Sequence, residues 1–445
     1  MRMCIYFPCL LLALWAGPAW GQTSPFQAAV VKKDITPETP QMLLGYGARK
    51  STGVHDQIYH RIVVMDDGDS RFYLVSSDIC LVSPSEYDRV AQILNQRYGI
   101  ERHDFWWSVT HTHSAPEVGP PGLPEVFLGD RYEHRFDTAY TNFVVKELVA
   151  GIGEAIKELK PADLGVGWGY SQANINRRAR DIDGKAFLGM NPDGPVDRKI
   201  GILKITDSQN GEPMALIANY AIHGTVMGGE NLLISGDAPG VVSAYVEQET
   251  GAPLLFINGA AGNIAPIYSV YPSPQAGRLH QFRALLGDKI IKAQEGIVTN
   301  IQSVSLQAHE LIIRTPRKNG LDWPSDLGDY SSQAADGSYL INLPVRFLKL
   351  NDNIAIWSAP LELFCEVSNE IRDRSPFPFT FYFGYTNGWL GYMLTEEEIQ
   401  YGGYEPTVSP YIDTVARELT EAVSAYLQGE LKSKQIPHLI KTPSK

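Results

Sequence analysis

Cysteine is scarce in this chain of 445 residues. Of its four cysteines, Cys4 and Cys9 lie in the first ten residues, so only Cys80 and Cys365 lie further along the chain. Two cysteines are too few for a disulfide framework, and the fold must depend on its apolar core. A single bridge between Cys80 and Cys365 and two buried free thiols are both compatible with the sequence.

Long hydrophobic runs are missing beyond the first residues. The segment 1–21 carries one charge, Arg2, an apolar stretch from Ile5 to Trp15, and a small-x-small end at Ala19-Trp20-Gly21. These features are typical of a signal peptide, and the apolar stretch is too short to span a bilayer. We therefore expect an exported protein, periplasmic or secreted, cleaved near Gly21 and without a transmembrane segment in its mature chain.

Positive charge is also in short supply. The chain has 38 Lys and Arg against 50 Asp and Glu, a net charge of −12, which argues against nucleic acid and anionic membranes as partners. With 44% apolar and 20% charged residues, the composition is that of a globular protein with a large core. Because no repeat and no Pro/Ser-rich linker interrupts the chain, we expect one large domain over 22–430 and a loose tail over 431–445.

The hydrophobic periodicity predicts a mixed α/β fold: one large domain with a mixed β-sheet core, flanking helices, and a metal site at strand ends. The expected helices are 84–98, 136–159, 240–248, 278–295, one starting at 361, and 412–426. The expected strands are 62–65, 72–75, 164–169, 200–205, 214–220, 254–257, 354–357 and 380–385, with a β-rich section over 304–350.

Two histidines follow an aromatic run at Trp106-Trp107. Read as a strand, the stretch places His111 and His113 on the same face, where two imidazoles can converge on a metal ion. A buried strand end with hydrogen-bonded histidines explains the same pattern.

Other polar residues stand just past apolar strands, where open α/β folds bind ligands. They are His223, the glycine-rich turn 258–263, Glu362 at an expected helix start, and Tyr392 in a glycine-broken aromatic loop. Each of them alone fits a structural role: a packed histidine, a tight turn, a helix-dipole partner or a core aromatic.

Taken in order, these motifs are similar to those of one family. The chain resembles the catalytic domain of the neutral/alkaline (non-lysosomal) ceramidases over nearly all of its mature length. The residues that carry the resemblance are Lys33-Asp34-Ile35-Thr36, Gly45-Tyr46, Gly53-Val54-His55-Asp56, Thr110-His111-Thr112-His113-Ser114, Ile175-Asn176-Arg177, Ile222-His223-Gly224, Pro360-Leu361-Glu362 and Gly391-Tyr392.

The resemblance implies one catalytic zinc ion per chain and a set of site residues. The implied zinc ligands are His111, His223, Glu362 and Tyr392. The implied catalytic residues are His113, Arg177 and Tyr404, and the implied substrate-binding residues are Gly45, Asn263 and Ala265. Read without the resemblance, Arg177 fits a surface cation and Tyr404 a loop aromatic.

The chain departs from the family's pattern at two points. Where the family carries an active-site serine, this chain has Ala265, in Gly262-Asn263-Ile264-Ala265-Pro266. Alanine can neither attack nor donate a hydrogen bond, so the protein is inactive or uses a zinc-activated water, and a complete zinc set favours water. Longer members also carry a C-terminal immunoglobulin-like domain, whereas this chain ends soon after its closing helix.

Three functions are compatible with these residues. The first is an exported, ceramidase-like zinc amidohydrolase of lipid metabolism, which cleaves the amide of N-acylsphingosine or a related N-acyl compound with a zinc-activated water. The second is a zinc hydrolase of another ester, lactone or amide, such as a glycan-derived substrate. The third is a non-catalytic binding protein with a relic metal site. In each case the partner is a small molecule or a lipid.

Overall fold

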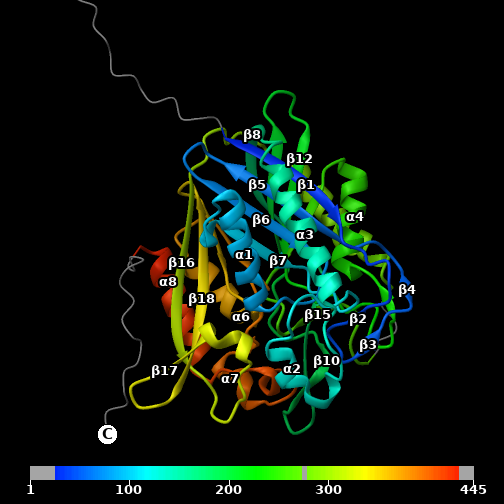
Figure 1. Cartoon of the computed structure of the whole chain (residues 1–445), viewed down its shortest axis with the longest axis vertical. Helices are drawn as coiled ribbons and strands as arrows, with labels where there is room; N and C mark the ends of the chain where they lie inside the picture. Colours follow the sequence, from blue (N-terminus) through cyan, green and yellow to red (C-terminus); the bar gives the residue numbers. More distant parts are fainter. Residues whose placement is uncertain (1–25, 273–277, 430–445) are drawn as a thin grey trace, which may run out of the picture.

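The computed structural model describes residues 26–272 and 278–429 (Figure 1). The signal peptide expected over 1–21 and the loose tail expected over 431–445 lie outside these residues. Among the helices of the described part, none combines the length and apolar character that a bilayer crossing requires.

The largest sheet has eight strands in two halves. One half contains β1 (Gln27–Asp34), β5 (Tyr59–Asp66), β6 (Arg71–Ser77) and β7 (Phe105–Val109); the other contains β8 (Lys160–Tyr170), β11 (Lys199–Asp207), β12 (Pro213–Tyr220) and β14 (Leu254–Asn258). The halves are joined only where β1 pairs with β8, at Gln27–Pro161 and Ala28–Lys160. Because only this short pairing connects the two halves, the sheet bends between β1 and β8. The halves therefore face each other, and β14 of one half contacts β5, β6 and β7 of the other.

A second sheet packs against the face of the first sheet that carries Trp106 and Ile257. It consists of β16 (Leu306–Pro316), β18 (Tyr339–Leu350), β19 (Ile354–Ser358) and β21 (Phe379–Phe383), with β17 (Ser331–Gln333) paired to β18. Alternate residues of these strands, such as Phe381 and Phe383, pack with Trp106 of β7 and Ile257 of β14 in one buried cluster. The strands of both sheets therefore enclose a shared apolar core.

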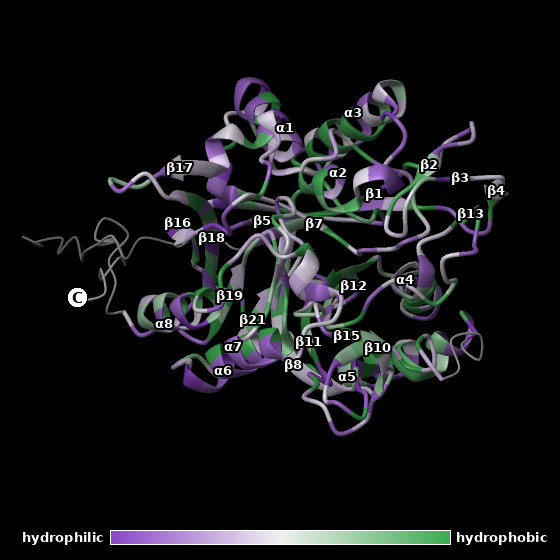
Figure 2. Ribbon diagram, turned by 90° about the horizontal axis from the view of Figure 1, so that it is seen from below, coloured by the Kyte–Doolittle hydropathy of each residue, from purple (hydrophilic) through white to green (hydrophobic). Residues whose placement is uncertain are grey.

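Helices cover the outer faces of the sheets (Figure 2). Figure 2 shows α1 (Pro84–Tyr98) and α3 (Thr138–Ala155) at one side, α5 (Asp288–Glu295) at another, and α6 (Cys365–Arg374) with α8 (Val415–Leu427) at a third. The helix α4 (Asp237–Thr250) packs on β14. The expected mixed α/β fold with flanking helices is thus confirmed. The strands of the second sheet lie where strands were expected, within 304–350 and at 354–357 and 380–385, but periodicity did not predict that they form a separate sheet.

Shorter elements connect this frame. They are β2 (Met42–Leu43), β3 (Arg49–Lys50), β4 (Gly53–Val54), α2 (Leu123–Leu128), β9 (Asn174–Arg180), β10 (Ala186–Asn191), β13 (Leu233–Ile234), β15 (Ile264–Pro266), β20 (Glu362–Leu363), β22 (Tyr392–Met393) and α7 (Glu396–Gln400).

Most expected elements are present, and some of their boundaries differ. The helix α1 has the expected bounds and ends at Gly99, whose φ of 69° suits glycine. The helix α3 is shorter at both ends than 136–159. The helix expected over 278–295 is present from 281 to 295, with a π-helical segment at Arg283–Gly287 that leads into α5.

Two expectations at the site were wrong. The strand β7 ends at Val109, and His111 has a left-handed φ of 60°, so the two histidines lie in a loop and not on a strand. The helix expected from 361 begins at Cys365, because Glu362 pairs in β20 with Tyr392 in β22. If the helix began at 361, Glu362 could not form its strand pairing with Tyr392.

Candidate metal centre

Loops after parallel strands bring the candidate ligands together. His111 follows β7 and His223 follows β12, both at the carboxyl ends of their strands. The side-chain amide of Asn258, at the end of β14, donates to the carbonyl of Thr110 at 3.3 Å and to that of Ile222 at 2.7 Å. One buried amide therefore ties the two histidine loops to each other.

His111, His223 and Glu362 form a buried cluster. The Oε2 atom of Glu362 lies 3.4 Å from Nε2 of His111 and 3.1 Å from Nε2 of His223. Nδ1 of His111 lies 3.0 Å from the carbonyl of Cys80, and Nδ1 of His223 lies 2.9 Å from the carbonyl of Ile264. When both Nδ1 atoms donate to these carbonyls, both Nε2 lone pairs face the carboxylate, an arrangement that suits a metal ion.

Glu362 is held from its other side by two aromatic donors. The hydroxyl of Tyr385 donates to Oε2 at 3.2 Å, and the indole of Trp389 donates to Oε1 at 3.0 Å. Sequence reasoning did not single out these two residues, since their only signal was a position near the aromatic loop of Tyr392. They fix the direction of the carboxylate, which a metal site requires.

The charges of the cluster follow from its burial. Burial opposes ionisation of Glu362, but His111 outweighs burial and holds the pKa of this carboxyl well below its usual range. Burial likewise opposes protonation of His111, but the Glu362 carboxylate raises its pKa to about 10. Burial and the Arg177 charge lower the pKa of His223 to about 3. In the metal-free cluster, His111 is therefore the imidazole that carries a second ring proton and a positive charge, beside the Glu362 carboxylate.

Arg177 of β9 is buried, so it is no surface cation. Its Nη1 lies 2.9 Å from Nε2 of His223, its Nη2 donates to the hydroxyl of Tyr392 at 3.0 Å, and its Nε donates to Glu405 at 3.0 Å. Burial raises the pKa of Tyr392 well above its ordinary value, so without a metal its hydroxyl keeps its proton. A phenolate ligand at Tyr392 would need a nearby cation, and its role as a ligand stays a prediction.

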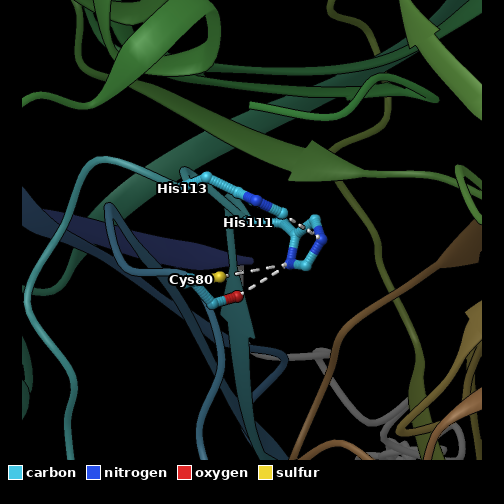
Figure 3. Close-up of side chains that lie close together, drawn as sticks. All are labelled: Cys80, His111 and His113. Atoms are coloured by element: carbon cyan, nitrogen blue, oxygen red, sulfur yellow. Dashed lines mark hydrogen bonds between the residues drawn. The ribbon is translucent and has the colours of Figure 1, made fainter. Parts of the chain in front are cut away.

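His113 lies beside the cluster. Its Nε2 is 3.1 Å from Nε2 of His111 (Figure 3), and its Nδ1 is buried without a hydrogen-bond partner among the described residues. Burial and the positive charge of His111 hold the pKa of His113 well below its usual range, so the ring is neutral. Gly45 backs this ring, since a Cβ added at Gly45 would lie 2.5 Å from its Cγ.

A pocket of about 430 Å³, counting the space open to solvent, lies beside His111 and Glu362, and neither His223 nor Arg177 is among the residues of its wall. The polar residues on its wall are His111, His113, Glu362, Tyr392 and Tyr404; the rest of the wall includes Leu44, Gly45, Leu81, Phe127, Leu128, Trp389 and Val408. Three residues expected to act on substrate, Gly45, His113 and Tyr404, therefore share one cavity.

Asn263 and Ala265, by contrast, are not among the residues that line this pocket. The amide of Asn263 donates to Glu366 at 2.7 Å and accepts from the backbone of Cys365 at 3.0 Å. Ala265 is buried in β15, where it pairs with Ile175. The expected part of Asn263 and Ala265 in substrate binding stays a prediction. In the structure Asn263 contacts the first residues of α6, and Ala265 is a paired residue of β15.

The sequence and the fold were compared with known proteins. Residues 26–263 match the family described as neutral/alkaline non-lysosomal ceramidase, N-terminal. The chain is 28% identical to the neutral ceramidase of Pseudomonas aeruginosa over 277 residues, 59% of this chain and 40% of that protein. It is 30% identical to neutral ceramidase B of Dictyostelium discoideum over 248 residues, 52% of this chain and 33% of that protein.

The fold is also similar to a solved structure. The crystal structure of neutral ceramidase from Pseudomonas aeruginosa superposes with a TM-score of 0.72 at 20% identity, over 92% of this chain and 75% of that one. A second structure, described as a ceramidase complexed with C2, has a TM-score of 0.72 at 19% identity.

The matched region exceeds half of the chain, so the chain belongs to the neutral/alkaline non-lysosomal ceramidase family. The match covers 40% of the Pseudomonas relative and 33% of the Dictyostelium one.

Proposed function

We propose that this protein is an exported zinc-dependent hydrolase that cleaves the amide bond of N-acylsphingosine or a related N-acyl compound with a zinc-activated water. One observation carries the proposal: two imidazole nitrogens and a carboxylate oxygen converge beside a pocket that His111 and Glu362 line and whose wall is largely apolar. Membership of the ceramidase family and the leader-like segment 1–21 support it.

The donor set fits zinc. His111, His223 and Glu362 offer one ligand atom each within 4.8 Å of one another, and Tyr392 is the proposed fourth ligand. A site with few protein ligands leaves a position open for water or substrate. When bound, the ion would polarise the amide carbonyl and lower the pKa of water toward neutrality.

The surrounding side chains supply hydrogen bonds and charge. His113 is neutral and offers an N–H to the carbonyl oxygen of the substrate, as a donor aimed at developing negative charge. Burial raises the pKa of the Tyr404 hydroxyl to about 12, so it also remains a donor. Arg177 places a positive charge against His223 and Tyr392, and Glu405 compensates part of that charge.

The attacking group must come from solvent. Ala265 has no hydroxyl, and it is buried in β15 and is not among the residues that line the pocket. Water therefore takes the place of a serine nucleophile, and no covalent acyl-enzyme forms. The apolar wall favours an acyl chain over a glycan, because it offers few hydrogen-bonding groups to hydroxyl-rich sugars.

The test is a direct assay of zinc-loaded protein. We expect release of fatty acid from ceramide, loss of release on chelation, and recovery on addition of zinc. Short-chain esters, lactones and N-acetylated amino sugars should react more slowly, and faster reaction of any of them would favour the second class of hydrolase. Protein with verified zinc that cleaves none of these substrates would instead support a relic site.

A further inference from the structure

A second buried arginine of β9 holds one later segment of the chain. Arg178 is 1% exposed. Its Nε donates to the Glu398 carboxylate at 2.6 Å, and its Nη2 donates to the backbone carbonyls of Glu398 at 2.8 Å and Gly402 at 2.9 Å. Its Nη1 donates to the Glu405 carboxylate at 2.5 Å. One guanidinium therefore ties the segment 398–405 to β9.

This segment carries Tyr404, which lines the pocket. Gly402 and Gly403 precede it with φ of 62° and 91°, in the left-handed region that glycine favours. Glycine leaves the backbone more conformational freedom than any other residue, so the glycines do not fix the place of Tyr404 by themselves. Arg178 holds the Gly402 carbonyl on one side of Tyr404 and the Glu405 carboxylate on the other. The position of the Tyr404 hydroxyl therefore depends on this arginine.

Glu405 joins the same arginine to the proposed catalytic arginine. Its Oε1 accepts from Nε of Arg177 at 3.0 Å, and its Oε2 accepts from Nη1 of Arg178. Neighbouring residues of a strand point to opposite faces, yet here both guanidinium groups reach one buried carboxylate. Arg177 in turn contacts His223 and the Tyr392 hydroxyl. A shift of Glu405 would therefore move Arg177 relative to the metal centre.

We propose that Arg178 is a positioning residue. Through the segment 398–405 it places the Tyr404 hydroxyl in the pocket, and through Glu405 it holds Arg177 against the metal centre. A planar guanidinium suits this task because it presents its N–H donors in a fixed fork, whereas lysine offers one compact ammonium that cannot span acceptors on both sides of Tyr404. The catalytic consequence rests on the proposed function, since Tyr404 and Arg177 act on a substrate. The tie between β9 and the segment does not.

The variant Arg178→Lys keeps the charge and removes the fork. Arg180→Lys is its matched control: Arg180 is also on β9 and donates to Glu398 at 2.6 Å, but in the described part of the chain it bonds to neither Gly402 nor Glu405. On zinc-loaded protein with ceramide, we expect kcat of Arg178→Lys to fall by up to about a hundredfold, the typical penalty for a misplacement of about 1 Å, with KM and zinc content unchanged. Arg180→Lys should keep the wild-type kcat.

A double substitution separates positioning from a merely structural role. If Arg178 acts through Tyr404, Arg178→Lys should lower kcat less in a Tyr404→Phe background than in the wild type, because the hydroxyl that it positions is already gone. A purely structural arginine would lower kcat by the same factor in both backgrounds. Equal kcat in Arg178→Lys and Arg180→Lys, or the same factor in both backgrounds, would overturn the proposal.

Amide hydrogen exchange tests the tie without a substrate. The segment 398–405 should exchange faster in Arg178→Lys than in the wild type, and at the wild-type rate in Arg180→Lys. Equal exchange in the two variants would refute the tie. Zinc-loaded wild type that cleaves no amide would contradict the proposed function, and exchange alone would then decide the tie. If Arg178→Lys does not fold, Glu405→Gln replaces it in each measurement with Glu398→Gln as its control, because Glu405, unlike Glu398, bonds to the proposed catalytic arginine.

Discussion

Substitution of Gly45 by alanine should disturb His113 without removing a proposed zinc ligand. Gly45 has a φ of +115°, and a Cβ there would lie 2.5 Å from Cγ and from Nδ1 of His113. Non-bonded carbon atoms are at their best separation at about 3.5–4.0 Å, so the ring must move by about 1 Å. Gly47→Ala is a matched control: its φ is +122°, but its new Cβ would meet nothing closer than the Arg131 carbonyl at 3.5 Å.

The size of the effect follows from this comparison. Both substitutions force alanine into a disfavoured backbone region, at a cost of order 1–3 kcal/mol each. Only Gly45→Ala adds overpacking, which typically costs about 1–3 kcal/mol. We therefore expect Gly45→Ala to lower the free energy of unfolding by about 1–3 kcal/mol more than Gly47→Ala does.

Three measurements on zinc-loaded protein check this prediction: urea unfolding, zinc content, and kcat/KM on ceramide. Zinc content should stay near one per chain in both variants. The rate for Gly45→Ala should fall by about a hundredfold, the typical penalty when a group is misplaced by about 1 Å. Equal stability and equal rates for the two variants would refute the contact between Gly45 and His113. Loss of zinc from Gly45→Ala alone would show that His113 supports the metal itself.

The remaining predictions concern the metal, the nucleophile and the thiol. His223→Ala or Glu362→Ala should stay folded and lose zinc, and zinc retained at wild-type stoichiometry in either would refute their place in the ligand set. Because the metal-free site holds a proton on His111, whose pKa is raised to about 10, zinc binding must release it. Zinc affinity should thus rise toward pH 10, by up to about tenfold per pH unit. Calorimetry in buffers of different ionisation enthalpy can measure the released proton. A pH-independent affinity would contradict the assignment of that proton to His111. In water labelled with heavy oxygen, the label should enter the carboxylate product directly. The substitution Ala265→Ser should change the rate only modestly. An acyl-enzyme trapped in the wild type would exclude the water mechanism. Cys80→Ser should cost less than about 5 kcal/mol of stability, the top of the range for a lost disulfide, as urea unfolding can test.

Local sequence signals predicted many of the elements because those signals act over a few residues. Pro84 at the first helical position and Gly99 just after the last one set the bounds of α1, although the Ser83 side chain makes no capping hydrogen bond. The apolar runs 62–65 and 72–75 likewise predicted strands there, and these strands are β5 and β6, which pair antiparallel. Where prediction missed a boundary, a distant partner was the cause: Glu362 is held in β20 by Tyr392, thirty residues further along the chain.

The site was anticipated as a set of residues and not as a geometry. The order of the motifs singled out His111, His223 and Glu362, and these three do converge in the structure. No pattern indicated the support given by Tyr385, Trp389 and Glu405, because an aromatic or an acidic residue in a loop is a common feature. For Cys80 the sequence allows a bridge to Cys365 or a buried free thiol, and nothing in its neighbours places it next to His111, whose Nδ1 lies 3.9 Å from its Sγ in the structure.

The sequence by itself determined the elements, the family resemblance and the chemical types of the candidate ligands. Periodicity, caps and motif order are properties of the sequence itself, so they can be recognised without knowledge of the fold. Only the tertiary structure decided which nitrogen of each histidine faces the cluster, that Arg177 is buried against His223, and that Asn263 is turned away toward Glu366. The physical reason is that these contacts join segments far apart in the chain, and they form only where strand ends meet and a buried polar atom must find its partner.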